Sequence, residues 1–418
     1  MIEKKLIANL GKLTIVGMGY VGAPLAYLAC NKGYEVYSVD VNQEKVNEIK
    51  VGVNYNLLKN RFHVSTHMET TEIYVVCVPT PIDSLNQPNL SFIRDAVETV
   101  SRVMDDGALI IIESTIFPGM CEDVIMPILD SSDKKYYLAH CPERINPGDK
   151  KWDVSNIDRI IGAIDNESLI RACFFYESIL DAKIIKVSSI KIAEAVKLFE
   201  NIFRDVNIAL VNELAKAFEI IGINVVEVIE AAATKPFGFI PHWPGVGVGG
   251  HCIAVDPYYM IESGRAVGFD YEFLKLARKI NSSMPIYAVD LLHSSLKKFG
   301  KSLVGTKVLI YGLAYKPELS DTRESPSYEV INNLINKKFS DVKVYDPFVA
   351  KESNFLSIKD ALNWAEILVI CTAHQEILNL EANDFKKLDF IFDGRNCLNL
   401  DKIKESGTNY QGIGRVCL

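Results

Sequence analysis

The chain of 418 residues lacks the marks of a secreted, membrane-spanning or disulfide-stabilised protein. No apolar run approaches the roughly 20 residues that a helix needs to cross a bilayer, and residues 1–11 hold no apolar stretch of signal-peptide length. The nine cysteines are odd in number and form no CxxC pair, a pattern typical of free thiols in a reducing compartment. We therefore expect a cytoplasmic protein that neither enters a membrane nor depends on disulfides.

Two common catalytic signatures are also missing. The seven histidines form no HExxH motif and no zinc-type spacing with cysteine, so we expect no metal site. There is no GxxxxGK[ST] loop of the P-loop type. The 45 Lys+Arg and 53 Asp+Glu give a formal charge of −8, which predicts no general attraction to nucleic acid or anionic lipid. The composition, 49% hydrophobic and 23% charged, is that of a globular chain of two or three domains.

What the sequence does contain begins with a glycine-rich turn. A short strand pattern at residues 13–16 runs into GMGYVG at 17–22, and a helical stretch then leads to a second strand pattern that ends in Asp40. Glycines in a GxGxxG turn let the pyrophosphate of a dinucleotide approach the backbone at a helix N-terminus. An acid at the end of the second strand accepts hydrogen bonds from ribose hydroxyls, which favours NAD over NADP. The predicted NAD-binding residues here are Gly17, Gly19, Tyr20, Val21, Gly22 and Asp40.

Two loops that follow strand patterns extend this site. VPTP occupies residues 78–81 and ESTIFPG residues 113–119. Both lie at the carboxyl edge of the predicted sheet, where doubly wound folds bind ligands. They offer Thr80, Ser114 and Thr115 as cofactor contacts, although as isolated motifs such segments are more often plain turns.

Further polar residues occur at a strand end and on a helix. PERINPG at residues 142–148 puts Glu143 and Arg144 at a strand end, where a carboxylate can act on a hydroxyl or order a water. Lys197 and Asn201 are four positions apart and therefore share one face of a helix. For an arbitrary Lys/Asn pair, a solvated polar stripe is the ordinary interpretation.

The middle of the chain has a different pattern from its two ends. Residues 190–221 repeat apolar side chains every three and four positions without a proline, which predicts one long amphipathic helix or two in succession. Its apolar stripe suggests a spacer and the surface of a homodimer or higher homo-oligomer. Strand and helix patterns alternate before it and again from residue 306. We predict an α/β protein with two Rossmann-like doubly wound domains (1–188 and 303–418) joined by a helical central region (189–302).

The strongest chemical signal is PGVGVGGHCIAVDPYY at residues 244–259. Its glycines make a backbone that a ligand can approach closely, and Cys252 follows them directly. Most cysteines of a globular chain are small, buried and inert. In a flexible glycine loop beside His251, exposed backbone N–H groups can instead favour a thiolate, which attacks an aldehyde or an activated acyl carbon.

A third loop follows the first strand of the second α/β half. It reads GLAYKPELSDTRESP and spans residues 312–326. Lys316 and Arg323 in this loop can meet the charge of a phosphate. A loop with so many charges is, however, ordinarily just solvated.

With GMGYVG, GGHCxxxDP and GLAYKxxxxDxRxSP in this order, the sequence resembles the UDP-glucose/GDP-mannose dehydrogenase family nearly from end to end. These nucleotide-sugar 6-dehydrogenases oxidise a sugar C6 alcohol to a carboxylate in two NAD-dependent steps without a metal. The resemblance implies that Cys252 captures the C6 aldehyde. The thiohemiacetal then gives up a second hydride to become a thioester, which water hydrolyses.

The resemblance also implies the roles of other residues. Lys197 and Asn201 match a Lys-x-x-x-Asn pair that stabilises developing oxyanion charge. Asp256 would assist proton movement, and Glu143 would lie near the hydrolytic water. The implied substrate-binding residues are Glu143, Arg144, Lys197, Asn201, Gly249 and Lys316. The cofactor residues implied beyond the glycine turn are Asp40, Lys45, Thr80, Ser114, Thr115, Glu122 and Arg323.

The sugar is indicated by a short segment before the cysteine loop. TKPFGF at residues 234–239 resembles the UDP-N-acetylglucosamine enzymes, and Lys235-Pro236-Phe237 departs from the His-Pro-Arg of many UDP-N-acetylmannosamine enzymes. GVGGHCIAVDP at 247–257 occurs among both, and Val246 stands where Pro or Ala is more usual. We predict oxidation of UDP-N-acetylglucosamine for surface polysaccharide synthesis, with UDP-N-acetylmannosamine and UDP-glucose left open.

Two other classes of function stay open. A non-catalytic nucleotide-sugar-binding or regulatory protein could keep the fold, but it would not need the complete set of Cys252, Lys197, Asn201 and Asp256. A one-step 2-hydroxy-acid dehydrogenase would account for the first α/β half. It would leave both Cys252 and the second α/β half unexplained.

Overall fold

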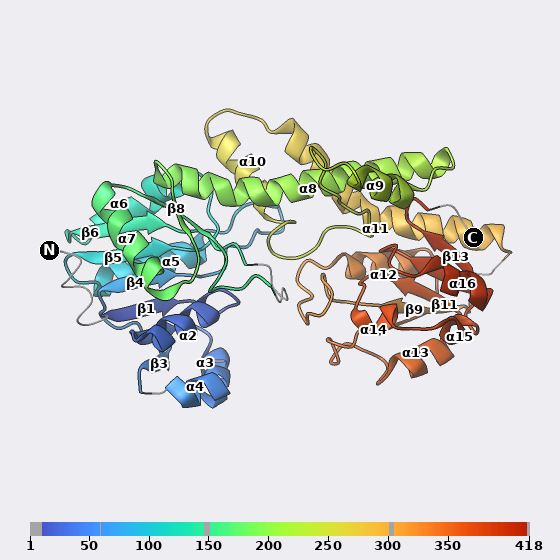
Figure 1. Ribbon diagram of the computed structural model, residues 1–418, viewed down its shortest axis with the longest axis horizontal. Helices are drawn as coiled ribbons and strands as arrows, with labels where there is room; N and C mark the ends of the chain where they lie inside the picture. Colours follow the sequence, from blue (N-terminus) through green and yellow to red (C-terminus); the bar gives the residue numbers. More distant parts are fainter. Residues whose placement is uncertain (1–10, 59, 146–150, 301–304, 416–418) are drawn as a thin grey trace. The chain divides into compact units, whose positions relative to one another are not determined.

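The computed structural model describes residues 11–58, 60–145, 151–300 and 305–415, which form two compact units (Figure 1). Unit 1 comprises Met1–Glu200 with Tyr258–Phe269, and unit 2 comprises Asn201–Pro257 with Asp270–Leu418. Each unit is built around its own sheet, which confirms the predicted α/β class with two Rossmann-like halves. The division into three domains at residues 188 and 302 stays a prediction.

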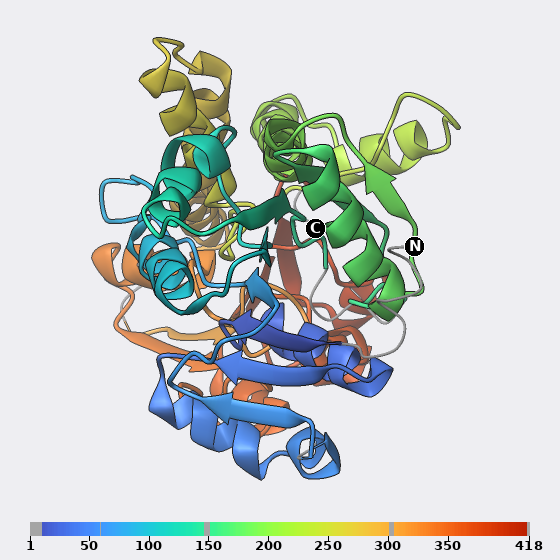
Figure 2. The same cartoon turned by 90° about the vertical axis from the view of Figure 1, so that its left-hand side faces the viewer.

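The sheet of unit 1 has eight strands in the order β3-β2-β1-β4-β5-β6-β7-β8 (Figure 2). Strands β1 to β6 are parallel, as predicted. The order reverses between β1 and β4, and the carboxyl ends of these two strands are the expected ligand-binding point of such a sheet. The strands are β1 (Lys12–Val16), β2 (Glu35–Val39), β3 (Phe62–Ser65), β4 (Ile73–Val76), β5 (Ala108–Ile112), β6 (Tyr136–His140), β7 (Arg159–Ala163) and β8 (Ile184–Lys186).

One edge of this sheet differs from the all-parallel prediction. Strand β7 pairs antiparallel with β6, through Ala139 opposite Ala163 and His140 opposite Gly162, and β8 continues parallel to β7. A parallel neighbour needs a crossover connection, usually a helix. The chain between β6 and β7 contains no helix among its described residues, so it turns back and the strand direction reverses.

Helices cover both faces of the unit 1 sheet. Buried side chains of α2 (Gly22–Lys32) and α7 (Asn166–Ile179) pack against one face, and those of α5 (Ser91–Val103), the π-helix η1 (Cys121–Ile125) and α6 (Met126–Asp130) pack against the other. Because both faces are covered, β5 is buried along its whole length. Two further helices follow β2, namely α3 (Gln43–Val51) and α4 (Val53–Leu58).

The sheet of unit 2 is fully parallel, with five strands in the order β10-β9-β11-β12-β13. Its strands are β9 (Lys307–Tyr311), β10 (Asp341–Tyr345), β11 (Ile367–Ile370), β12 (Phe390–Asp393) and β13 (Asn409–Gly412). The accompanying helices are α12 (Pro326–Asn336), α13 (Ile358–Trp364), α14 (Gln375–Leu378), α15 (Ala382–Phe385) and α16 (Leu400–Ser406).

The helices of the middle share a core with this second sheet. Helix α8 (Ile190–Ile220) is one long helix, the first of the two alternatives that the apolar periodicity predicted, and it begins in unit 1 and ends in unit 2. In unit 2 its residues pack with α9 (Val225–Ala233), α11 (Glu272–Lys298) and the apolar side chains of β9, β11 and β12. Helix α10 (Asp256–Ala266) begins directly after the cysteine loop. No helix of the described residues is both long and apolar enough to span a membrane.

Candidate active site

The glycine turn after β1 has the geometry of a dinucleotide-binding turn. Gly17 has a φ of +93°, and a Cβ added there would lie 2.7 Å from the carbonyl oxygen of Cys77. A Cβ at Gly22 would lie 1.9 Å from the carbonyl oxygen of Gly17, so the first and third glycines are required by close packing. A Cβ at Gly19 would meet nothing within 4 Å. The backbone is therefore open at the second glycine, where a pyrophosphate has to approach.

Asp40 is held against this turn by backbone donors. It follows the last residue of β2, and its Oδ2 accepts a hydrogen bond from the backbone N–H of Met18 at 3.0 Å. Its Oδ1 accepts from the N–H of Asn42 at 2.9 Å. Asn42 in turn caps α3, which carries the half-buried Lys45. The carboxylate thus lies beside the glycine turn, as an acid that receives a ribose must.

The other predicted residues of the turn lie at the start of α2. Val21 occupies the N-cap position of this helix, and its neighbour Tyr20 is exposed. Together with the open backbone at Gly19 and the carboxylate of Asp40, this arrangement fits the dinucleotide NAD. The turn and the helix N-terminus would hold its pyrophosphate, and Asp40 would hold its adenosine ribose.

The loop after β5 is tied to the loop after β4 and to helix α8. The Ser114 hydroxyl donates to the carbonyl oxygen of Val78 at 2.8 Å, and Thr80 and Thr115 are half-buried nearby in these same loops. The fully buried carboxylate of Glu194, on α8, accepts from the backbone N–H groups of Gly119 at 2.6 Å and Cys121 at 2.9 Å. Sequence reasoning missed Glu194, because only the fold brings this helix residue to the loop.

Glu122, predicted to contact the cofactor, is engaged in an ion pair. Its Oε2 lies 2.6 Å from Nζ of Lys191, one turn before Glu194 on α8. Both side chains are about half exposed, so the pair is accessible to solvent and its net contribution to stability is small. Its role toward NAD stays a prediction.

The loop after β6 contacts the next turns of α8. Nζ of Lys197 lies 3.5 Å from Oε2 of Glu143, and both side chains are largely buried. Arg144, predicted to bind substrate, donates to the Glu200 carboxylate at 2.6 Å and to the carbonyl oxygen of Asp158 at 2.8 Å. If Arg144 binds the substrate, its guanidinium would therefore contact both the substrate and Glu200.

A buried ionic cluster lies at the same edge of the sheet as Glu143, and sequence reasoning did not identify it. The Glu113 carboxylate, directly after β5, accepts a hydrogen bond from the Tyr176 hydroxyl at 2.5 Å and lies 3.7 Å from Arg159. Burial raises the pKa of Glu113, and the positive charge of Arg159 opposes this shift. Burial also lowers the pKa of His140 to about 3, and the charge of Lys197 adds to that effect.

In unit 2, the glycines of the cysteine loop pack closely against other segments of the same unit. A Cβ at Gly249 would lie 2.6 Å from the carbonyl oxygen of Glu324, and one at Gly250 would lie 2.7 Å from the ring of Tyr315. A Cβ at Gly245 would lie 2.7 Å from Arg395. Close packing within the protein is therefore one reason for these glycines. The close approach of a ligand to this backbone stays a prediction. Val246, the departure from the family pattern, is fully buried in the core of unit 2.

Cys252 and Asp256 lie on either side of one turn at the start of α10. The backbone N–H groups of Val255 and Asp256 both donate to the carbonyl oxygen of Cys252, at 3.1 and 2.8 Å. Nδ2 of Asn201, on α8, donates to Oδ2 of Asp256 at 2.6 Å, with both side chains buried. The structure thereby joins two of the residues that the sequence proposed for the chemistry, Asn201 and Asp256, by a direct hydrogen bond.

The cysteine loop is also linked to the loop after β9. Arg323 donates to the Asp321 carboxylate at 2.5 Å and lies 3.2 Å from Nδ1 of His251, the residue before Cys252. The backbone N–H of Gly250 donates to the carbonyl oxygen of Arg323 at 3.2 Å. Lys316 is half-buried in the same loop.

Most of the other described cysteines are buried, as expected for unreactive thiols. Cys30, Cys121, Cys141, Cys173 and Cys371 are buried, whereas Cys77, Cys252 and Cys397 are only partly so. Burial raises the pKa of Cys141 and of Cys371 to about 12, which keeps both as thiols. Cys417 lies outside the described residues.

The corresponding turn of unit 2 is closed by its own side chains. Asp346 follows β10 as Asp40 follows β2, but its Oδ2 accepts from the N–H groups of Leu313 at 2.7 Å and Ala314 at 2.9 Å and lies 3.1 Å from Nε2 of His374. Burial alone would raise the pKa of Asp346, but these partners hold it below its usual value. Its Oδ1 also accepts from the N–H of Phe348 at 2.8 Å, so Asp346 has more partners than Asp40 and is buried, whereas Asp40 is partly exposed.

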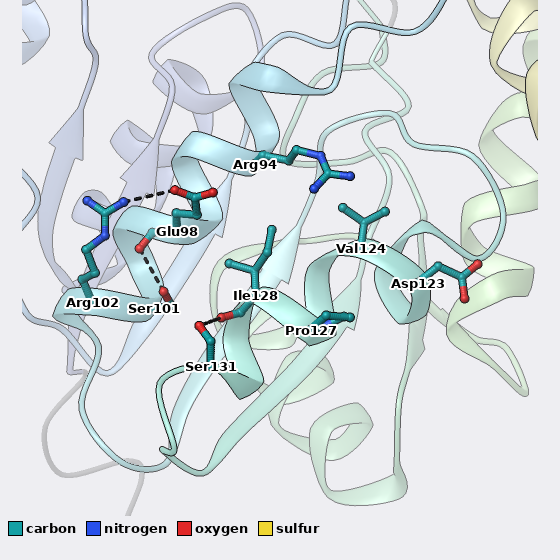
Figure 3. Close-up of a pocket in the computed structure, with 9 residues that line it drawn as sticks. All are labelled: Arg94, Glu98, Ser101, Arg102, Asp123, Val124, Pro127, Ile128 and Ser131. Atoms are coloured by element: carbon teal, nitrogen blue, oxygen red, sulfur yellow. Dashed lines mark hydrogen bonds and ion pairs between the residues drawn. The ribbon is translucent and has the colours of Figure 1, made fainter.

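Away from these residues, a surface hollow of about 470 Å³ lies between α5 and the η1–α6 segment (Figure 3). Arg94 and Arg102 line it together with Glu98 and Asp123, and Arg102 is paired with Glu98 at 3.1 Å. None of the candidate residues contributes to it. Among the described residues, no group of three or more His, Cys, Asp or Glu side chains is placed to hold a metal.

Three family models match the chain in sequence. The NAD binding domain of the UDP-glucose/GDP-mannose dehydrogenase family matches residues 11–180, its central domain matches 191–283, and its UDP binding domain matches 309–400. The cofactor is accordingly NAD, in agreement with the geometry of the glycine turn and Asp40.

Relatives match over almost the whole chain. A UDP-N-acetyl-D-mannosamine dehydrogenase of Methanocaldococcus jannaschii is 37% identical over 99% of this chain and 98% of its own. A UDP-N-acetyl-D-glucosamine 6-dehydrogenase of Pseudomonas aeruginosa is 34% identical over 94% of this chain and 98% of its own. The solved structure of a UDP-D-ManNAc dehydrogenase from Pyrococcus horikoshii is 34% identical, covers 97% of this chain and 99% of its own, and superposes with a TM-score of 0.89. This chain therefore belongs to the UDP-glucose/GDP-mannose dehydrogenase family.

Proposed function

We propose that this protein oxidises C6 of a UDP-N-acetylhexosamine from the alcohol to the carboxylate, with Cys252 as the nucleophile. One sugar, one water and two NAD would give one uronate, two NADH and three protons. The observation that carries the proposal is the buried hydrogen bond between Asn201 and Asp256. It holds Asn201, the proposed oxyanion donor, against Asp256, the proposed acid–base group four residues after Cys252. NAD would accept the hydride in each of the two oxidation steps.

The residues of the chain would act in the order in which charge develops. Cys252 would attack the C6 aldehyde, and the oxygen that becomes negative would be stabilised by Lys197 and Asn201. Asp256 would exchange the proton of the thiol and of the hemiacetal hydroxyl. After the second oxidation, Glu143 would orient the water that hydrolyses the thioester. Its contact with Lys197 at 3.5 Å supports a shared role of the two side chains.

Two observations favour different epimers of the sugar. The segment 234–239 resembles UDP-N-acetylglucosamine enzymes, and its side chains are exposed at the end of α9. The relatives at 34–37% identity that are named for UDP-N-acetyl-D-mannosamine favour the mannosamine epimer. We therefore propose these two sugars as the candidates, with UDP-glucose as the third. A uronate attached to UDP is an activated donor, which suits the synthesis of a surface polysaccharide.

We also propose that the protein acts as a homodimer. Helix α8 exposes Phe199, Phe203 and Leu210, and the loop after α9 exposes Phe237 and Ile240. Large apolar side chains gathered on an exposed helix are typical of a protein interface. Sedimentation equilibrium would test this: a monomer at micromolar concentration would refute it.

The substrate test is a count of NADH. Purified protein would be supplied with NAD and, separately, UDP-N-acetylglucosamine, UDP-N-acetylmannosamine and UDP-glucose. We expect two NADH for each molecule of one N-acetylhexosamine and little from UDP-glucose. One NADH per sugar would refute the four-electron reaction, and no NADH from any of the three would favour a binding protein.

A further inference from the structure

A chain of buried polar side chains runs from helix α11 through α8 to the start of the cysteine loop. Arg278 donates to Oδ1 of Asp205 at 2.5 Å, and Nδ2 of Asn281 donates to the same oxygen at 2.8 Å and to the backbone oxygen of Asp205 at 2.9 Å. Nδ2 of Asn212 donates to Oδ1 of Asn281 at 2.9 Å. Oδ1 of Asn212 accepts from the backbone N–H of Gly245 at 3.0 Å. All four side chains are buried, and all five residues belong to unit 2.

The direction of this chain is set at its Asp205 end. Asp205 offers only oxygen atoms to Asn281, so Asn281 has to turn its Nδ2 toward Asp205 and its Oδ1 toward Asn212. Asn212 must then use its own Nδ2 as the donor, which leaves its Oδ1 for Gly245. Each amide is therefore oriented by its neighbour, and a reversed amide would leave donors facing donors in a dry interior.

Asn281 meets the cysteine loop at a second point. A Cβ added to Gly247 would lie 3.5 Å from the backbone oxygen of Asn281 and 3.0 Å from the side chain of Pro326. Further along, the N–H of Gly250 is bonded to the carbonyl oxygen of Arg323. The loop from Gly245 to Gly250 is thus held by hydrogen bonds at its start and its end, and it is closely packed at its middle.

We propose that Asn212 and Asn281 are positioning residues, which orient Gly245 and thereby hold the loop that presents Cys252. This inference rests on the proposed function for its catalytic meaning, because it takes Cys252 as the nucleophile. The hydrogen-bonded chain acts on the shape of the loop and does not contact the substrate in this account. Loss of either amide removes the hydrogen bonding that holds Gly245. The glycines of the loop have little conformational preference that could replace this restraint.

The first test is amide hydrogen exchange of the full chain, followed by mass spectrometry and without any substrate. In Asn212→Leu, whose side chain has a similar volume, we expect the amides of residues 248–255 to exchange at least tenfold faster. The control is Leu296→Ala, which removes buried volume on α11 about 22 Å along the helix from Asn281. It should leave the exchange of 248–255 unchanged. Unchanged exchange in a folded Asn212→Leu protein would overturn the proposal.

A rescue experiment tests the direction of the chain. Asn281→Asp removes the donor and sets two carboxylates face to face, so exchange of residues 248–255 should rise at least tenfold. Adding Asp205→Asn supplies a new N–H from the other side while its oxygen still accepts from Arg278. This double variant should return to within about threefold of the wild type. A double variant whose residues 248–255 exchange as fast as those of Asn281→Asp would contradict the proposal. This comparison does not depend on whether Asn212→Leu folds.

Steady-state kinetics of Asn212→Leu and Asn281→Asp test whether the shape of the loop matters for catalysis. Both disruptive variants should lower kcat at least tenfold and leave the KM for NAD nearly unchanged, because the glycine turn and Asp40, to which we assign most of the NAD binding, lie in unit 1. A loss that appears only in the KM for NAD would contradict the proposal. A wild-type protein inactive on every UDP-sugar would refute the proposed function, and the exchange experiment would still decide whether the chain holds the loop.

Discussion

Asn201 donates a hydrogen bond from its side-chain nitrogen to the carboxylate of Asp256 at 2.6 Å, and both residues are buried. Asn201 lies one helical turn after Lys197 on α8, and Lys197 contacts Glu143 at 3.5 Å. Two successive turns of one helix therefore each hold an acid that the proposed reaction uses. A buried carboxylate that accepts a hydrogen bond from an amide is sensitive to the loss of that donor.

We predict that Asp256→Ala lowers kcat about 100-fold or more, because it removes an acid–base group and leaves the Asn201 amide unpaired. Binding of NAD, measured by protein fluorescence, should be unchanged. The control is Asp290→Asn, which removes a half-exposed ion pair with Lys337 in the same unit and should retain kcat. Wild-type turnover in Asp256→Ala would exclude a role of this acid in proton transfer.

Asp40→Ala should weaken NAD binding at least tenfold, as judged by the Kd from calorimetry. The substitution removes the proposed ribose acceptor, its hydrogen bond from Met18 in the glycine turn and its hydrogen bond from Asn42 at the start of α3. Glu44→Gln, on the neighbouring turn of α3, is the matched control and should bind NAD normally. An unchanged Kd in Asp40→Ala would remove Asp40 from the cofactor site.

Glu194→Gln should destabilise the loop after β5. The carboxylate accepts from two backbone N–H groups, whereas a glutamine side chain can offer an oxygen to one of them and must turn an NH₂ group toward the other. We expect a loss of about 1–3 kcal/mol in the free energy of unfolding and a raised KM for NAD. A variant with wild-type stability in urea and an unaltered KM would show that this buried carboxylate does not hold the loop.

The stability of the protein should fall in mild acid partly because of His140. Burial lowers its pKa from the usual 6.5 to about 3, so between these values the unfolded chain binds a proton that the folded chain does not. Stability therefore decreases as the pH falls below 6.5, by about 1.4 kcal/mol per pH unit from this residue alone. Urea unfolding of wild type and His140→Gln at pH 7 and pH 5 checks this. Equal slopes with pH in the two proteins would contradict it.

The sequence predicted features whose cause is local. The GxGxxG turn was recognisable because Gly17 and Gly22 must be glycine for the chain to close on itself, and Asp40 follows at the end of the next strand. The long helix α8 followed from its apolar repeat. The reversed direction of β7 was missed, since strand patterns carry no information on direction.

Residues whose partners lie far away in the sequence were beyond this reasoning. Glu194 and Asp205 look like ordinary polar positions of an amphipathic helix, and only the fold reveals a loop or another helix opposite each of them. Arg159 begins a strand and is fully buried beside Glu113, which no local pattern indicates. The glycines before Cys252 pack against Tyr315 and Pro326, which come from another segment, so the sequence could not indicate this packing.

The most direct test of the covalent mechanism is the mass of the peptide that contains Cys252. Glu143→Gln would be incubated with NAD and the UDP-N-acetylhexosamine that yields NADH, quenched in acid, digested and weighed. We predict a Cys252 peptide heavier by the oxidised UDP-sugar, because hydrolysis of the thioester is slowed, and no such peptide when NAD is omitted. An unmodified Cys252 peptide, together with full uronate formation by Cys252→Ser, would contradict the account.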